Sequence, residues 1–219
     1  MVVSGGSGSG KTSLLNLLAS SIPADERIIA MQDSGEIQLN ARRLVLLETR
    51  PPNREGRGAV SMRDLVQHAI MMLPERLIVS EVRDGAAVDL ITALNNGHPG
   101  GLFGIHATSP RDALSRLEVM VTMGNPSIPA LGVREMLTSA IDLIVQLERM
   151  IDGQRRIVAI SEVQRIERDV IVVQDIFRFE PPEQSESVGR FVATGHIPTF
   201  WKTLRDRGVS TSMDQFAPA

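Results

Sequence analysis

The feature that most constrains the fold of this chain is the glycine-rich segment Gly-Gly-Ser-Gly-Ser-Gly-Lys-Thr at residues 5–12. It matches the P-loop pattern, in which four variable residues separate a glycine from Gly-Lys-Ser/Thr. Val2 and Val3 before it are typical of a strand, and an apolar helical pattern follows at Leu14, Leu15, Leu17 and Leu18. The segment therefore predicts a tight turn between strand and helix, with backbone N–H groups that converge on a phosphate at the helix N-terminus.

The polar side chains of this segment have predictable roles in such a site. The ammonium group of Lys11 would contact the β- and γ-phosphates of a nucleoside triphosphate, and the hydroxyl of Thr12 would ligate Mg²⁺. We expect the nucleotide to contact the whole turn and the start of the helix, namely Gly6, Ser7, Gly8, Ser9, Gly10, Lys11, Thr12 and Ser13. The alternative is a glycine-serine loop that matches by chance, and the flanking strand and helix patterns argue against it.

Length and composition limit the class of protein. The 219 residues suit one domain with an appendage or two small domains, and 42% hydrophobic with 22% charged residues is ordinary for a globular chain. The net charge of −3 does not indicate nucleic-acid binding, and the absence of cysteine excludes disulfides. Without a membrane-length apolar run or a signal peptide, a cytoplasmic protein is expected. Because the P-loop starts at residue 5, we also expect that an upstream segment is missing.

Strand and helix patterns alternate over the first part of the chain. Short apolar strands are predicted at 27–31, 44–47, 77–79 and 102–105, and helices at 61–73, 85–94, 110–121 and 130–139. This alternation implies an α/β fold with a mainly parallel sheet covered on both faces. Further strands at 143–147, 156–160 and 170–177 predict an antiparallel meander. We expect one domain over residues 1–180 and, over 181–219, a polar linker and a tail with a short helix.

Polar residues follow three of the predicted strands: Asp33 and Glu36 the first, Glu81 another and His106 a third. Because the carboxyl ends of parallel strands meet at one edge, we expect these side chains beside the P-loop. Glu81 would orient the attacking water or hold Mg²⁺, while Glu36 and Asp33 would add carboxylates near the γ-phosphate. His106 would sense that phosphate or bond to the glutamate. The alternatives are a surface glutamate, a solvated turn and, for His98 and His106, structural histidines.

Arginines are concentrated in one short stretch, at positions 42, 43, 50, 54, 57 and 63. Arginine suits the clamping of phosphate across a subunit interface. A solvated loop or a contact with nucleic acid explains such a run equally well. Both interpretations stay open at this point.

Four motifs resemble those of the secretion-superfamily traffic ATPases, and in particular the CpaF/TadA branch that drives assembly of tight-adherence (Flp) pili. They are a Walker A motif at 5–12, an aspartate box at 33–36, a Walker B motif at 77–83 and a histidine box between 97 and 107. The stretches 47–53 and 109–118 look like that branch in detail, and residues 189–195 are similar to its C-terminal ending. The resemblance covers nearly the whole chain.

This resemblance implies a RecA-like P-loop NTPase domain in a ring hexamer, with ATP between neighbouring subunits and an N-terminal domain that this sequence lacks. By position, Glu81 matches the Walker B glutamate and Glu36 the glutamate of the aspartate box, while Arg50 and Arg57 match arginines near the nucleotide. The expected catalytic residues are Glu81, Glu36, Lys11 and His106. The expected ligands of Mg²⁺ are Thr12, Asp33 and Glu81.

The chain departs from the family pattern at four positions. Gln32 and Ala86 stand where a glutamate is usual, Ser80 replaces the Walker B glycine, and Thr108 replaces an asparagine. None of these changes removes a residue expected to bind the nucleotide or to act in catalysis. Hydrolysis is therefore expected, with a weakened ATPase as an open alternative.

We expect a Mg²⁺-dependent ATPase that powers Flp pilus assembly from the cytoplasmic face of the inner membrane. ATP and Mg²⁺ are its expected cofactors, and inner-membrane platform proteins are its expected partners, without direct contact with nucleic acid. One alternative is a conjugation-type ATPase for DNA transfer, which shares the chemistry but has other partners. A second is a nucleotide-binding scaffold whose turnover is lost through Gln32 and Ser80.

Overall fold

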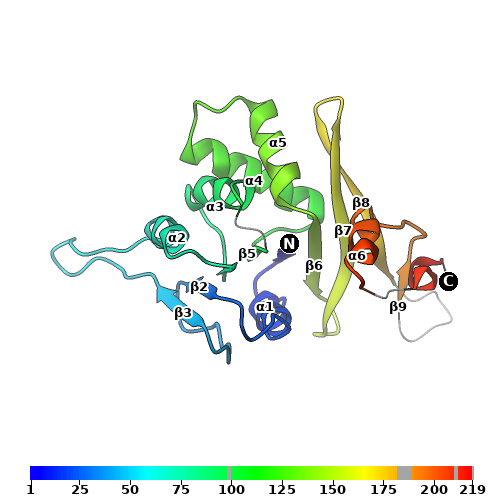
Figure 1. Cartoon of the computed structure of the whole chain (residues 1–219), viewed down its shortest axis with the longest axis horizontal. Coiled ribbons are helices and arrows are strands. Elements are labelled where there is room, and N and C mark those ends of the chain that lie inside the picture. Colours follow the sequence, from blue (N-terminus) through cyan, green and yellow to red (C-terminus); the bar gives the residue numbers. More distant parts are fainter. Residues whose placement is uncertain (98–99, 182–188, 210–211, 219) are drawn as a thin grey trace.

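The computed structural model describes residues 1–97, 100–181, 189–209 and 212–218. Within these residues a nine-stranded sheet has the order β3-β2-β4-β5-β1-β6-β7-β8-β9 (Figure 1). The strands are β1 (Val2–Gly5), β2 (Ile28–Gln32), β3 (Leu44–Glu48), β4 (Arg76–Val79), β5 (Leu102–Ile105), β6 (Leu143–Arg149), β7 (Arg155–Glu167), β8 (Val170–Glu180) and β9 (Arg190–Ala193). His98 and most of the expected linker lie outside the described residues.

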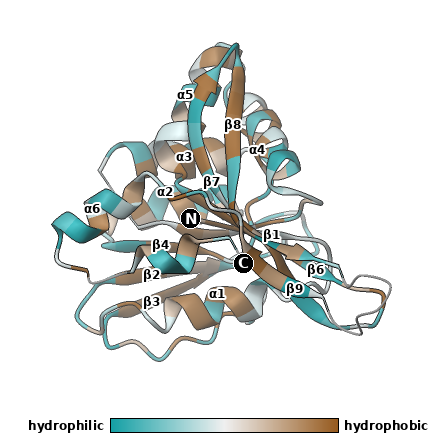
Figure 2. Ribbon diagram, turned by 90° about the vertical axis from the view of Figure 1, so that its right-hand side faces the viewer, coloured by the Kyte–Doolittle hydropathy of each residue, from teal (hydrophilic) through white to brown (hydrophobic). Residues whose placement is uncertain are grey.

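Strands β1 to β6 pair in parallel, and helices cover both faces of this part of the sheet (Figures 1 and 2). Helix α1 (Lys11–Ala19) packs on one face, where Leu15 shares a buried cluster with Val3 of β1. The opposite face carries α2 (Met62–Met71), α3 (Ala86–Asn95), α4 (Pro110–Gly124) and α5 (Ala130–Ala140). The predicted α/β class is confirmed. Among the described residues, none of the helices combines the length and the apolar character that crossing a membrane requires.

The sequence signals for helix starts act as expected. The Ser61 hydroxyl accepts a hydrogen bond from the Asp64 N–H at 3.2 Å, and the Asp64 carboxylate accepts one from the Ser61 N–H at 2.8 Å. This reciprocal capping satisfies donors that would otherwise lack partners at the start of α2. At the start of α4, whose first residue is Pro110, the Ser109 hydroxyl accepts a hydrogen bond from the Asp112 N–H at 3.1 Å.

The C-terminal strands extend the same sheet. Strand β6 lies parallel to β1, with Leu147 beside Gly5, and antiparallel to β7. Strands β7 and β8 form a long antiparallel hairpin, which confirms the predicted meander. Strand β9 pairs with β8 in a region where we expected only linker and tail. The sheet therefore continues beyond residue 180.

The tail covers one side of this meander. It contains the short helix α6 (Phe200–Asp206) and the 3₁₀ helix η1 (Met213–Phe216). Trp201 of α6 and Phe216 of η1 form a small buried cluster with Ile176 of β8. The predicted tail helix is thus present, and its aromatic face packs on the sheet instead of facing solvent.

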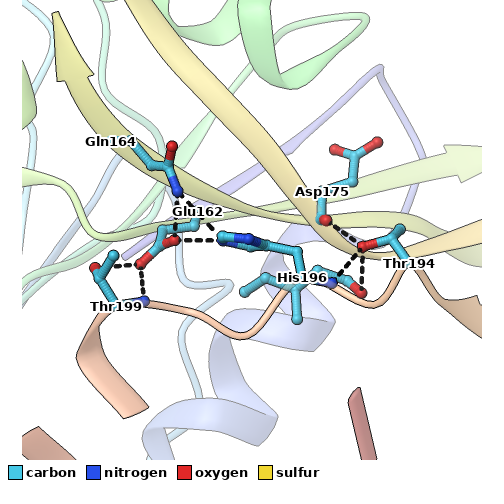
Figure 3. A network of polar contacts seen from close by, with 7 residues as sticks. Glu162, Gln164, Asp175, Thr194, His196 and Thr199 are labelled. Atoms are coloured by element: carbon cyan, nitrogen blue, oxygen red, sulfur yellow. Dashed lines mark hydrogen bonds and ion pairs between the residues drawn. The ribbon is translucent and has the colours of Figure 1, made fainter. Parts of the chain in front are cut away.

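A buried carboxylate holds the tail in place (Figure 3). Glu162 of β7 accepts hydrogen bonds from the N–H and hydroxyl of Thr199 at 2.7 and 2.6 Å, and from the Gln164 amide at 3.0 Å. Nε2 of His196 lies 2.7 Å from the same carboxylate. Burial raises the pKa of Glu162, but the hydrogen bonds from Thr199, Gln164 and His196 outweigh it and hold the pKa below its usual value. The ionised carboxylate therefore stabilises the folded tail.

We expect Glu162→Ala to lower the free energy of unfolding by about 3 kcal/mol at pH 7, because it removes the buried acceptor that Thr199, Gln164 and His196 share. The contribution of Glu162 is present above its unfolded-state pKa of about 4.3 and is lost as the pH falls through the lower folded-state pKa. Urea denaturation at pH 7 and pH 3 measures both values, and the difference from wild type should shrink at pH 3.

Glu167→Ala is the matched control for this prediction. Glu167 lies on the same strand, but it is exposed, and within the described part of the chain its carboxylate pairs only with the exposed Arg165. Its replacement should change stability by less than about 0.5 kcal/mol. Equal losses for the two variants would contradict the role of Glu162 in holding the tail.

Candidate active site

The P-loop connects β1 to α1 with a backbone that only glycine adopts easily. Gly8 and Gly10 have φ angles of 69° and 96°, in the left-handed region that other residues avoid. At Gly5, a Cβ atom would lie 2.4 Å from the Ser9 hydroxyl oxygen and 2.6 Å from the Leu147 carbonyl oxygen. The glycines of the motif are therefore required by the turn itself and by the close approach of β6.

Lys11 is buried against the loop that precedes it. Its ammonium group donates hydrogen bonds to the carbonyl oxygens of Gly5 and Gly6, at 3.0 and 3.1 Å. Burial lowers the pKa of Lys11, while the nearby carboxylate of Glu81 acts in the opposite direction. A poorly hydrated cation at this position attracts phosphate more strongly than an exposed one, because the local dielectric screens the interaction less.

Thr12 and Glu36 meet at the start of α1. The Thr12 hydroxyl donates to the Glu36 carboxylate at 3.0 Å, and the Asn16 amide donates to the Glu36 carbonyl oxygen at 3.0 Å. The Asn16 amide oxygen in turn accepts from the N–H of Gln38 at 3.1 Å. Helix α1 thereby positions the loop that follows β2. Sequence reasoning did not single out Asn16, although its spacing of four from Thr12 places both on one helix face.

Glu81 follows β4 and is held by an arginine. Its carboxylate accepts a hydrogen bond from Nε of Arg83 at 3.1 Å, and this bond raises the pKa of Arg83. The same guanidinium lies 3.5 Å from the carboxylate of Asp33. Asp33 also accepts from the Thr49 hydroxyl at 3.1 Å. Arg83 thus joins the two carboxylates and fixes the direction of Glu81.

One cavity of about 430 Å³ collects most of the predicted residues. It is lined by Ser7, Gly8, Ser9, Gly10, Lys11, Thr12, Ser13, Glu36, Glu81, Arg83, His106 and Arg155. Lys11, Thr12, Glu36 and Glu81 therefore face one space, with the exposed His106 at its rim. Gly6 contributes through its carbonyl bond to Lys11. Sequence reasoning missed Arg83 and Arg155 as cavity residues.

The side-chain oxygen atoms that line this cavity suit Mg²⁺. The Thr12 hydroxyl and the carboxylates of Glu36 and Glu81 are hard oxygen donors, which Mg²⁺ prefers. Among the described residues, no group of three or more His, Cys, Asp or Glu could hold a metal ion unaided. Mg²⁺ usually takes one or two protein ligands and completes its shell with phosphate and water, so Thr12 and one carboxylate would suffice to hold it.

Asp33, Arg50 and Arg57 do not line this cavity. Asp33 and Arg50 line a second cavity of about 610 Å³, which shares Glu81 and Arg83 with the first. Nε of Arg50 donates to the Gly58 carbonyl oxygen at 2.7 Å and so closes its own loop. Arg57 is exposed, and its N–H donates to the Asn53 side chain. Within one chain, Glu36 and not Asp33 is the carboxylate next to Thr12, and the roles of Arg50 and Arg57 at the nucleotide stay predictions.

Three of the departures from the family pattern have structural roles. Gln32 is buried, and its amide oxygen accepts from the N–H of Ile37 at 2.7 Å, which closes the loop that carries Glu36. Ala86 is the first residue of α3 and is buried in the core. Thr108 donates from its N–H and its hydroxyl to Asp112, at 2.8 and 3.0 Å, at the start of α4. None of these three lines the P-loop cavity.

Comparisons with known proteins find a matching family model and several relatives. The family model described as "Type II/IV secretion system protein" matches residues 1–183. Conjugal transfer protein TrbB of Rhizobium radiobacter is 38% identical over 170 residues, which are 76% of this chain and 48% of that protein. Type IV secretion system protein PtlH of Bordetella pertussis is 38% identical over 161 residues, which are 71% of this chain and 47% of that protein.

A solved structure has a similar fold over most of this chain. The crystal structure of the VirB11 ATPase from the Brucella suis type IV secretion system, in complex with sulphate, matches with a TM-score of 0.66 at 30% identity. The match covers 74% of this chain and 47% of that one. The chain spans about half the length of the curated relatives it matches.

Proposed function

The chain belongs to the type II/IV secretion system protein family, and on that premise we propose that it is the ATP-hydrolysing part of a secretion motor. The observation that carries this proposal is the single cavity shared by Lys11, Thr12, Glu36 and Glu81. A phosphate-binding loop, oxygen ligands for Mg²⁺ and a carboxylate that orients water are the parts that phosphoryl transfer requires. The segments that follow β2 and β4 supply the two carboxylates.

The proposed mechanism assigns each residue one task. The backbone N–H groups of the P-loop and the Lys11 ammonium bind the phosphates, and Thr12 with Glu36 would hold Mg²⁺. Mg²⁺ held there would neutralise charge on the phosphate oxygens. Glu81 positions water in line with the γ-phosphate, and its bond to Arg83 fixes its orientation. Catalysis then depends on positioning and on charge stabilisation.

For the machine that this motor serves, we propose a conjugal-transfer or type IV secretion system. Two relatives named as conjugal-transfer and type IV secretion proteins support this choice over the Flp pilus machinery that the sequence motifs suggested. The alternative of a DNA-transfer ATPase is therefore preferred to our first expectation. We further propose a ring of subunits on the cytoplasmic face of the inner membrane, in which closure between neighbours converts nucleotide state into movement.

The structure also bears on the scaffold alternative. Gln32 is buried, and Ser80 is largely buried, with a backbone N–H that bonds to Met31. Neither change displaces Glu36 or Glu81 from the cavity. This supports hydrolysis over a scaffold without turnover.

A complementation experiment tests the proposal. The gene is deleted in the organism that carries it, and full-length wild type or the Lys11→Ala variant is returned. Wild type but not the variant should restore conjugal DNA transfer or type IV protein secretion. The purified wild type should release phosphate at a rate per chain that rises with protein concentration. Loss of pilin assembly with transfer and secretion intact would overturn the assignment to this class of machine.

A further inference from the structure

The β6–β7 hairpin lies beside the P-loop, because β6 pairs with β1. Leu147 of β6 lies beside Gly5 of β1 and opposite Ile157 of β7. Ile157 packs against the buried cluster under α1. Because side chains in a strand alternate between faces, Arg155 shares the face of Ile157, two positions further towards the P-loop. Arg155, the first residue of β7, is therefore on the face of the sheet that carries α1.

The position of Arg155 agrees with this alternation. Its Cδ atom lies 3.3 Å from the place that a Cβ atom on Gly10 would occupy, and Arg155 lines the P-loop cavity. Arg156 is on the opposite face, where it pairs with Asp152 at 2.8 Å and lies over the ring of Phe179 at 5.7 Å. Two adjacent arginines therefore have different surroundings, and one of them faces the phosphate-binding loop.

Lys11, Arg83 and Arg155 line the cavity and differ in the hydrogen bonds and ion pairs that they make within the chain. Lys11 is bonded to carbonyl oxygens of its own loop, and Arg83 is paired with Glu81 and Asp33. No hydrogen bond or ion pair joins the Arg155 guanidinium to any other described residue. A guanidinium with its donors free matches the geometry of phosphate oxygens, which it binds through two parallel N–H bonds.

We propose that Arg155 binds the phosphate oxygens of the nucleotide from within the same chain. The proposal rests on the proposed function of the cavity and names a binding residue that the sequence motifs did not contain. It differs from the expectation for Arg50 and Arg57, which the structure places outside this cavity. Arg155 supplies positive charge on the side of the phosphates facing the β6–β7 hairpin, and so it stabilises the charge that develops during transfer.

The test compares the neighbouring arginines in the full-length protein. Binding of fluorescent ATP and ADP analogues is measured in a Glu81→Gln background, which removes turnover, and kcat/KM is measured with Glu81 intact. We expect Arg155→Ala to weaken binding or to lower kcat/KM by about tenfold or more. Arg155→Lys keeps the positive charge but cannot form two parallel N–H bonds to a phosphate, so it should recover part of the loss. Arg156→Ala should stay within about twofold of wild type.

The outcomes separate the two proposals. If Arg155→Ala weakens the binding of ATP but not of ADP, Arg155 contacts the γ-phosphate. If it weakens the binding of both equally, Arg155 contacts the inner phosphates. Either result supports Arg155 as a phosphate-binding residue. An Arg155→Ala variant within about twofold of wild type, or an equal loss in Arg156→Ala, overturns this inference while hydrolysis stands. Nucleotide binding that depends on Arg155 without any phosphate release would overturn only the proposed hydrolysis. Absence of binding by the wild type overturns both.

Discussion

Lys11→Ala will abolish nucleotide binding and reduce phosphate release by at least about a thousandfold. The ammonium group is the only buried cation at the P-loop among the described residues, and it is held at the loop by two carbonyl bonds. Alanine removes both the charge next to the phosphates and the bonds that fix the loop. Isothermal titration with ATP and a phosphate-release assay of the full-length protein measure the two effects.

The chain offers a matched control for this variant, because its only other lysine is Lys202. Lys202 is exposed on α6, in the tail. Lys202→Ala should bind and hydrolyse ATP like wild type. Wild-type binding by Lys11→Ala, with its fold verified by circular dichroism, would count against the whole assignment of the cavity.

Glu81→Gln will separate binding from chemistry. The amide keeps the size of the side chain and an oxygen that accepts from Arg83, but it loses the charge that orients and activates water. We expect hydrolysis to fall by about 100- to 1000-fold, with the affinity for ATP changed by less than about threefold. Single-turnover phosphate release and equilibrium binding distinguish these two quantities.

Glu75→Gln is the control for this second variant. Glu75 lies just before β4, at the end of that strand opposite to Glu81, and it is exposed. Its replacement should leave the rate of hydrolysis unchanged. If Glu81→Gln weakened binding and rate to the same extent, Glu81 would be a ground-state ligand of the nucleotide and not the residue that orients water.

The sequence predicted the strands and helices of the parallel part well, because each follows a local pattern. The P-loop requires glycines at set positions, and apolar residues repeat with the period of a strand or a helix. The outcome was different for the C-terminal region. Strand β9 escaped prediction because four residues next to a polar stretch carry little periodic signal, and only pairing with β8 makes them a strand.

The candidate site was predictable in part. Glu81 and His106 follow buried strands, and the rule that the carboxyl ends of parallel strands share one edge placed them near Lys11. The rule did not distinguish Asp33 from Glu36, which belong to one loop. The bonds from Thr12 and Asn16 to Glu36, and from Thr49 and Arg83 to Asp33, decide that difference.

The sequence by itself determined the phosphate-binding turn, with Lys11 and Thr12, since a glycine-rich turn before a helix depends only on neighbouring residues. Tertiary structure alone decided that Glu36 faces the cavity, that Asp33 pairs with Arg83, and that Arg155 reaches Gly10 from a distant hairpin. The physical reason is that these contacts follow from strand order and from the register of β6 against β1 and β7, which join segments far apart in the chain.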